Sequence, residues 1–219
     1  MGKTKQELIS DIELRVTRGK PSDDLELEQD QIAHWIETTA NSVVADYLNK
    51  LIRANKAIPP QYIAKVLAIQ LAQETAPSNT DEGIRHYLDF SSYDVMPLDN
   101  DKGIVRVSTL SGKRVNAIND EENFEMLNKM YFSRPSRENL LWYREGDSIY
   151  VKGYGNSITT AVKLNVYYVP VIEVSSLANT AEVNITEDLL PIILDIVEEK
   201  AFRQLGYGFE DLQNDGTQA

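Results

Sequence analysis

A long run of apolar residues at helical spacing stands out in the first quarter of the chain. It extends from about Leu25 to Asn55, and its apolar positions are Ile32, Trp35, Ile36, Ala40, Val43, Val44, Leu48, Leu51 and Ile52. Residues three or four positions apart lie on one face of an α-helix, so the pattern predicts a helix on the order of 45 Å long. A single apolar stripe on such a helix needs another helix or a neighbouring subunit to cover it. The prolines of Ile58-Pro59-Pro60 are expected to stop the helix.

Two shorter segments have the same spacing. The first, residues 3–19, has its apolar positions at Leu8, Ile9, Ile12 and Val16. The second, Glu187–Leu205, follows Thr186, a residue type that caps helices, and its apolar positions are Leu189, Ile192, Ile193, Ile196, Val197 and Ala201. We expect Leu25–Asn55 and Glu187–Leu205 to pack together as a helical layer.

The middle of the chain has shorter apolar segments that predict strands. Between Gln61 and Glu74, Leu67, Ile69 and Leu71 alternate with Ala68 and Gln70. This alternation favours a strand that follows a short turn at Pro60, although the alanines also fit a helix. Further strands are predicted at 84–90, 104–107, 113–118, 140–144, 148–152 and 162–170, with a short helix at 121–130.

The order of these elements predicts an α+β fold. The N-terminal helices and the C-terminal helix form a helical layer, and a mainly antiparallel β region lies between them in sequence. We expect the N-terminal helices in residues 1–58, the β region in residues 59–172, and the closing helix with an extended tail in residues 173–219. Together they are predicted to form one structural unit.

Composition narrows the classes of function. The 219 residues include 22 Lys and Arg against 34 Asp and Glu, a net charge of −12. Proteins that bind nucleic acid through its phosphates carry the opposite balance, although a negative wall suits a channel through which DNA passes without sticking. The absence of cysteine excludes disulfides, thiolate zinc sites and cysteine nucleophiles. Neither a secretory signal nor a run of about 18 apolar residues is found, which predicts a soluble protein without a membrane partner.

Motifs for catalysis or cofactor binding are not found in the sequence. The two histidines, His34 and His86, are too few for a metal site and are predicted at the surface or an interface. The segment Asp99–Gly103 fails the calcium-loop pattern, because Ile104 and Leu110 occupy the positions that require Gly and Glu. No catalytic, cofactor-binding or metal-binding residue is therefore predicted.

Tyrosine is the more informative residue type. The chain has 11 tyrosines, including Tyr143, Tyr150, Tyr154, Tyr167, Tyr168 and Tyr207. Tyrosine is common in protein interfaces, because it buries a large area and keeps a polar tip. It also fills the interiors of ordinary sheets, and the sequence leaves both interpretations open.

The order of the motifs along the chain resembles a known family. The motifs are Gly103-Ile-Val-Arg-Val107, Phe132-Ser-Arg-Pro135, Trp142-Tyr-Arg-Glu-Gly-Asp-Ser-Ile-Tyr150, Val166-Tyr-Tyr-Val-Pro170, residues 185–195 and Leu212-Gln-Asn-Asp-Gly216. Together with the long N-terminal helix, they resemble the head-to-tail connector (adaptor or ring) proteins of short-tailed bacteriophages, most closely those of crAss-like phages. The motifs extend over residues 84–216, and the N-terminal helices match in architecture.

The resemblance implies a structural virion protein of the neck or tail, made in the cytoplasm of the host bacterium. Such a protein forms a ring, usually of twelve copies, below the portal, and it joins the capsid to the tail. Its partners would be further copies of itself, the portal protein and adjacent tail ring or fibre proteins. Genomic DNA would pass through the lumen without specific binding. No enzymatic activity or cofactor is implied.

Two groups of residues are expected at assembly interfaces. The first, on the long helix, is Trp35, Ile36 and Val44, and changing Ile36 and Val44 to Asp is expected to abolish the ring. The second is the tail, 206–219, with Tyr207, Phe209, Asp211, Leu212 and Asn214. We expect the tail to reach a neighbouring ring or the portal.

Three alternatives remain open. The chain could be another tail or fibre-adaptor protein, or a minor capsid protein. It could also be a small acidic hydrolase whose carboxylates meet only in the folded protein.

Overall fold

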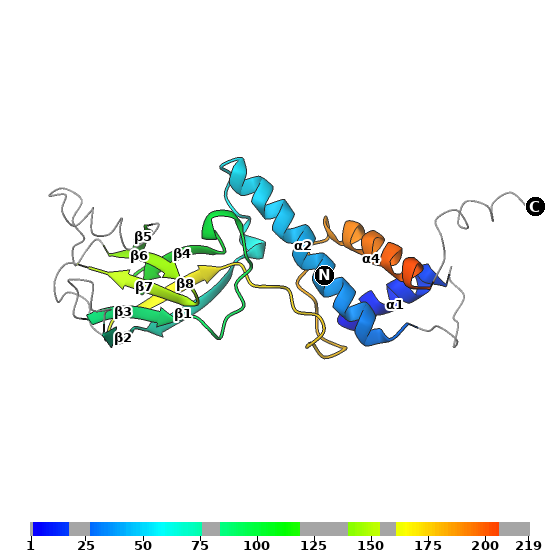
Figure 1. The fold of residues 1–219 in the computed structure, drawn as a ribbon, viewed down its shortest axis with the longest axis horizontal. Coiled ribbons are helices and arrows are strands. Elements are labelled where there is room, and N and C mark those ends of the chain that lie inside the picture. Colours follow the sequence, from blue (N-terminus) through cyan, green and yellow to red (C-terminus); the bar gives the residue numbers. More distant parts are fainter. Residues whose placement is uncertain (1, 18–26, 76–83, 119–139, 154–160, 206–219) are drawn as a thin grey trace, which may run out of the picture. The chain divides into compact units, whose positions relative to one another are not determined.

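The computed structural model describes residues 2–17, 27–75, 84–118, 140–153 and 161–205 (Figure 1). Two compact units are formed: a helical unit, Met1–Lys50 with Val171–Ala219, and a β unit, Leu51–Pro170. The helical unit contains the N-terminal helices and the C-terminal helix, and the β unit contains an eight-stranded sheet. The predicted α+β class is confirmed. The helix predicted at 121–130 lies outside the described residues.

The first helix, α1, runs from Lys5 to Val16 and is shorter than the predicted 3–19. Its start is fixed by a capping box: the Glu7 N–H donates to the Thr4 hydroxyl (3.3 Å), and the Thr4 N–H donates to the Glu7 carboxylate (2.8 Å). At the other end, Thr17 is already outside the helix. The buried residues include the four predicted from the spacing, Leu8, Ile9, Ile12 and Val16.

The second helix, α2, runs from Gln29 to Arg53, a length of about 37 Å. It ends earlier than predicted, and the prolines at 59–60 are not the cause. Asn55 adopts a left-handed backbone with φ +52°, its N–H donates to the Ile52 carbonyl (3.0 Å), and the Lys56 N–H donates to the Leu51 carbonyl (2.9 Å). These two bonds form a Schellman motif, with asparagine at the position that glycine usually takes.

The C-terminal helix, α4, runs from Leu190 to Gln204 and starts three residues later than predicted. The segment from Glu187 to Leu189 forms a turn in which the Leu189 and Leu190 N–H groups donate to the Thr186 carbonyl. Pro191 lies in the first helical turn, where a missing N–H leaves no hydrogen bond unmade. The buried stripe also differs from the prediction: Leu194 and Phe202 are buried, whereas Ile192 is 49% exposed.

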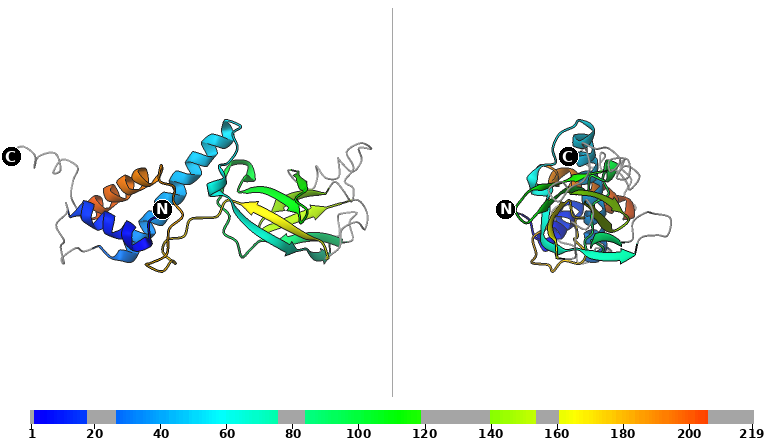
Figure 2. Two further views of the ribbon diagram at one scale, coloured as in Figure 1. Left: turned by 180° about the vertical axis from the view of Figure 1, so that it is seen from behind. Right: turned by 90° about the vertical axis from the view of Figure 1, so that its left-hand side faces the viewer.

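The three helices lie side by side in the helical unit (Figures 1 and 2). α1 contacts α4 through Arg15, which forms ion pairs with Asp195 (2.7 Å) and Glu198 (3.1 Å). α2 is joined to α4 by a hydrogen bond from the Lys200 ammonium to the Thr39 hydroxyl (2.7 Å). The predicted helical layer is confirmed.

The sheet of the β unit has the strand order β1-β8-β4-β5-β6-β7-β3-β2. The strands are β1 Ala64–Gln70, β2 Ala72–Thr75, β3 Ile84–Asp89, β4 Ile104–Thr109, β5 Arg114–Ala117, β6 Leu141–Glu145, β7 Ser148–Lys152 and β8 Lys163–Tyr168. Short 3₁₀ turns lie at Pro60–Tyr62 and Asp99–Asp101. Neighbouring strands are antiparallel, except that β5 and β6 are parallel. β1 and β2 are the two ends of the order, yet only Leu71 separates them in sequence, so the sheet curls (Figure 2).

The segment 61–74 is extended, as favoured from its alternation, but it forms two strands, β1 and most of β2, after the 3₁₀ turn at Pro60–Tyr62. Within β1, one residue interrupts the alternation. The pairing of β1 with β8 shifts register between Val66 and Ile69, and Ala68 has φ +57°. This β-bulge turns Leu67 outward, where its side chain is 60% exposed, while Val66 and Ile69 pack against the core. The prediction that Leu67 shares a face with Ile69 is therefore wrong.

The core of the β unit is a single apolar cluster. It consists of Leu71, Leu88, Phe90, Ile104, Val107, Val115, Trp142, Ile149, Val151, Leu164 and Val166. Gly103 precedes β4 at a point of close approach, because a Cβ atom there would lie 2.4 Å from the Met96 carbonyl oxygen. Its carbonyl accepts a hydrogen bond from the Val169 N–H (2.8 Å), which ties the start of β4 to the end of β8.

Candidate assembly surfaces

The segment after the sheet is bound to α2 by two polar side chains. The Asn41 side chain donates to the Ile172 carbonyl and accepts from the Ile172 N–H, both at 2.8 Å. One turn earlier, a Glu37 carboxylate oxygen accepts from the N–H groups of Val174 and Ser175, both at 2.8 Å. These bonds satisfy backbone groups of a segment that has no regular secondary structure.

The environment of Glu37 favours its charged form. Burial by itself would raise the pKa of this carboxyl, but the hydrogen bonds from Val174 and Ser175 and the nearby His34 hold the pKa below its ordinary value. Glu37 therefore acts as an anionic anchor for the segment that begins at Val171.

Charged groups on α1 make two further kinds of contact. Lys5 is only 5% exposed, and its ammonium donates to the carbonyls of Ser175 (2.9 Å) and Leu177 (3.2 Å). Arg15 lies at the surface, and its hydrogen bond to Asp195 raises the pKa of its guanidinium despite partial burial. Exposed ion pairs of this kind contribute about 0–1 kcal/mol, so the buried Lys5 contact matters more for the fold.

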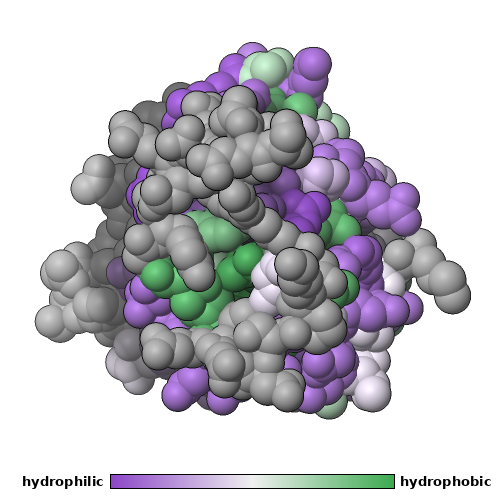
Figure 3. All heavy atoms as spheres, turned by 90° about the vertical axis from the view of Figure 1, so that its right-hand side faces the viewer, coloured by the Kyte–Doolittle hydropathy of each residue, from purple (hydrophilic) through white to green (hydrophobic). Residues whose placement is uncertain are grey.

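Two large apolar side chains of the helical unit are exposed. Leu14 on α1 and Ile192 on α4 are 50% and 49% exposed. Figure 3 shows a face of this unit where apolar atoms gather near the centre, with hydrophilic atoms around them. Exposed apolar area with a polar rim is typical of interaction surfaces.

The residues predicted at assembly interfaces differ in how far they are buried. Ile36 and Val44 are 0% and 1% exposed, so their side chains already lie in the interior of the folded chain. Trp35 is half-buried. The tail residues Tyr207, Phe209, Asp211, Leu212 and Asn214 lie outside the described residues.

The two histidines are not brought together. His34 is exposed on α2, and His86 is half-buried in β3, where burial lowers its pKa. Within the part of the chain that the structure describes, no three His, Cys, Asp or Glu residues are placed to hold a metal ion. None of the described helices is long and apolar enough to cross a membrane.

Most of the described tyrosines lie in strands of the sheet. Tyr143 and Tyr150 are buried and stack at 5.2 Å, and the Tyr150 hydroxyl donates to Glu74 (2.9 Å). Burial and the bond to Glu74 raise the pKa of Tyr150 to about 12. Tyr167 in β8 lies between two cations, with Lys65 and Arg106 at 5.2 and 5.3 Å from its ring centre.

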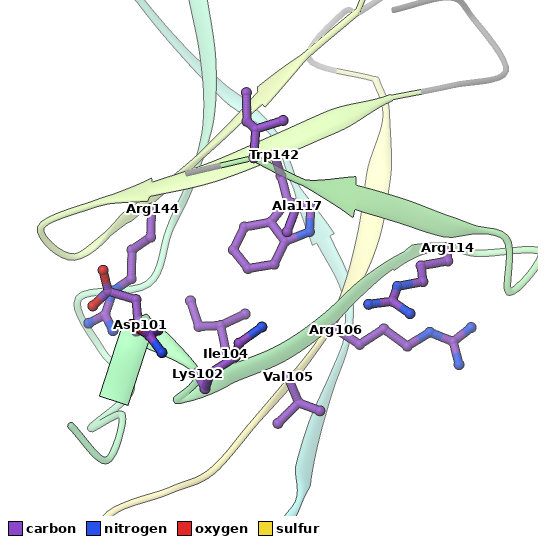
Figure 4. Close-up of a pocket in the computed structure, with 11 residues that line it drawn as sticks. Asp101, Lys102, Ile104, Val105, Arg106, Arg114, Ala117, Trp142 and Arg144 are labelled. Carbon is purple, nitrogen blue, oxygen red and sulfur yellow. The ribbon is translucent and has the colours of Figure 1, made fainter. Parts of the chain in front are cut away.

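A cleft of about 490 Å³ opens where β4 and β5 separate. β5 pairs with β4 only at Val115 and Arg114, and then pairs with β6 through Asn116 and Ala117. The first half of β4 consequently has β8 on one side and the cleft on the other. Figure 4 shows the Trp142 ring directed from β6 into this space.

The cleft is basic, although the chain as a whole is acidic. Its lining includes Lys102, Arg106, Arg114 and Arg144, against one carboxylate, Asp101. Lys102 and Arg144 lie toward the end that holds Asp101, and Arg106 and Arg114 lie toward the other (Figure 4). None of these four cations has an ion-pair partner within the described residues. Such an arrangement is suited to an anionic ligand.

Sequence reasoning missed this cleft, because its residues come from separate segments, 100–106, 114–118 and 142–144. The pairing of β5 with β4 and then with β6 brings them together. The available signal was indirect: Gly103-Ile-Val-Arg-Val107 and the segment from Trp142 to Tyr150, two of the motifs that carry the family resemblance, both contribute to the lining.

Comparison with known proteins identifies a family. A model of the family described as phage tail ring protein 2, a family of crAss-like phages, matches residues 7–218. The match therefore extends over the described parts of both units except residues 2–6. No match was found among curated proteins.

Proposed function

Because this chain belongs to the phage tail ring protein 2 family of crAss-like phages, we propose that it forms the ring that connects the head to the tail below the portal. Family membership makes it a structural ring protein of the virion. The position below the portal, the count of twelve copies and the passage of DNA through the lumen are parts of the proposal. The observation that carries it is the match over residues 7–218.

The charge of the chain supports a channel role. A net charge of −12 distributed over each copy repels a DNA backbone, so DNA can slide through a lumen without binding. The exposed Leu14 and Ile192 and the half-buried Trp35 are proposed as subunit contacts in the helical unit. Glu7, Glu37 and Asp89 have pKa values lowered by hydrogen bonds within the chain, so none of these three carboxyl groups has the raised pKa of a general acid.

Light scattering on the purified protein, alone and mixed with the portal protein, tests the proposal. The expected result is a large ring, or a monomer that forms one only when portal is added. A protein that assembles with fibre proteins and ignores portal would instead be a ring or adaptor elsewhere in the tail. A monomer that ignores both would contradict the proposal.

A further inference from the structure

The cleft combines positive charge with an apolar floor. Four of its lining residues are cations, and only Asp101 is acidic. Its floor includes Ile104, 3% exposed, and Trp142, 7% exposed, with Ala117 and Ile118 beside them. A ligand that fits both features carries carboxylates or other anions next to apolar side chains.

Two of the cations are free to bind such a ligand. Lys102 and Arg114 are exposed and have no ion-pair partner within the described ranges. Arg106 is more constrained, because its guanidinium donates to the Gly112 carbonyl (2.7 Å) and lies over the Tyr167 ring. Arg144 donates through Nε to the Gly146 carbonyl (2.9 Å), which leaves its other N–H groups available.

One segment of this chain has the matching chemistry. Residues 206–216 read Gly-Tyr-Gly-Phe-Glu-Asp-Leu-Gln-Asn-Asp-Gly, with Glu210, Asp211 and Asp215 and without a Lys or Arg. Tyr207, Phe209 and Leu212 supply apolar groups next to these carboxylates. Ten residues reach roughly 33 Å when extended, so the segment can bridge from one subunit to the next.

A ring explains why the segment and the cleft would meet between copies. In a closed ring with a single rotation axis, each contact is heterologous: one surface of a subunit meets a different surface of the next. Such a contact needs a donor element and an acceptor site on every copy, and an acidic segment and a basic cleft form a complementary pair. We propose that residues 207–215 of one copy bind in the basic cleft of the next copy in the same ring, an inference that rests on the proposed ring function.

Peptide binding tests the cleft directly. A fluorescein-labelled peptide of residues 206–216 is titrated with the full-length protein, and its anisotropy is followed. The variant Lys102→Glu/Arg114→Glu should weaken binding at least about tenfold, because two attractive charge pairs become repulsive. Lys113→Glu is the matched control, since Lys113 is an exposed cation next to Arg114 but does not line the cleft. Equal affinities for the wild type and the double variant would overturn the inference.

Charge reversal in both partners identifies the pairing. A peptide with Glu210→Lys and Asp211→Lys should bind poorly to the wild type and regain affinity for the Lys102→Glu/Arg114→Glu protein. A labelled DNA duplex is titrated in parallel. If the duplex, and not the peptide, loses affinity on the double substitution, the cleft binds nucleic acid and the inference is wrong.

Mixing full-length variants distinguishes binding between copies from binding within one copy. The cleft variant Lys102→Glu/Arg114→Glu and the tail variant Glu210→Lys/Asp211→Lys should each fail to form rings alone. Mixed in equal amounts, they should form rings of alternating copies, measured by light scattering. Loss of assembly that mixing does not restore, or rings formed by each variant alone, would contradict binding between copies.

These results separate the inference from the proposed function. Intact rings from every variant would contradict a role of the cleft in ring assembly, but they would not contradict the connector proposal. Absence of rings from the wild type, with and without portal, would remove the connector proposal, and peptide titration would still decide whether the cleft binds the segment.

Discussion

Glu37 joins two parts of the helical unit that are far apart in sequence. Its carboxylate accepts backbone hydrogen bonds from Val174 and Ser175, 137 and 138 positions away. The helical spacing of α2 placed Ile36 on the apolar stripe, but it gave no reason to single out Glu37. A polar residue on a predicted helix is usually in contact with water, and only the folded chain shows that this one binds a second segment.

Glu37→Gln should destabilise the protein by about 1–3 kcal/mol at pH 7, because an amide is a weaker acceptor for two backbone N–H groups than a carboxylate. Since folding lowers the pKa of Glu37, its stabilisation is complete above the unfolded-state value near 4.5 and is lost as the pH falls through the lower folded-state value. Urea unfolding at several pH values measures this difference.

Asp46→Asn serves as the control, since Asp46 is an exposed carboxylate on the same helix. Its effect should stay within about 0.5 kcal/mol at each pH. A gap between the wild type and Glu37→Gln that does not shrink in acid would contradict the proposed role of the charge.

At the scale of helices and strands, single residues determine where α2 ends and where β1 bulges. The spacing of apolar residues did not predict either feature. α2 ends because Asn55 takes a left-handed conformation, three residues before the segment Ile58-Pro59-Pro60 that was expected to stop the helix. In β1, Ala68 takes a similar conformation, and its N–H donates to the side chain of the buried Asn165 (3.0 Å). That side chain also donates to the Thr109 carbonyl (3.3 Å), so one asparagine ties the bulge of β1 to the end of β4.

Ala68→Gly should stabilise the β unit by about 0.5–1 kcal/mol, because glycine adopts a positive φ without the steric cost that alanine incurs. Ala57→Gly is the control, since Ala57 is exposed and does not have a positive φ. That change should leave stability equal or slightly lower. Thermal unfolding of both variants measures the difference, and a destabilised Ala68→Gly protein would show that the bulge is absent.

At the scale of the whole molecule, two units contain separate groups of buried residues. The members of the core cluster of the β unit fall between positions 71 and 166 of the sequence. The helical unit buries other residues, on α1, α2 and α4. Ile36, predicted at a subunit interface, is completely buried. Loss of ring formation in an Ile36→Asp/Val44→Asp variant would therefore reflect a damaged interior as well as a lost contact.

Ile36→Asp should unfold the helical unit and leave the β unit folded, because a buried unpaired carboxylate is strongly destabilising and the sheet does not depend on it. Hydrogen exchange with mass spectrometry should show lost protection in α1, α2 and α4 and retained protection in β3, β6 and β7. Thr38→Asp, at an exposed position on α2, is the matched control and should retain protection throughout. Loss of protection in both units after Ile36→Asp would contradict independent stability of the β unit.

The sequence by itself determined the fold class, the three helices that the structure describes, most of the strands and the resemblance to phage ring proteins. These features depend on local spacing and on motif order, which can be read along the chain. The strands of the hairpin from Leu141 to Lys152 belong to this group. The family match then confirmed a phage tail ring protein, while the position below the portal stays a prediction.

Tertiary structure alone decided which polar residues have partners and where the cleft lies. Glu37 and Lys5 bind backbone groups of a distant segment, and the cations of the cleft come from three separate parts of the chain. The bulge in β1 also reversed the side of the sheet to which Leu67 belongs. Spacing reports which side chains share a face, but contacts between distant segments depend on how the sheet curls and on hydrogen bonds that form only in the folded chain.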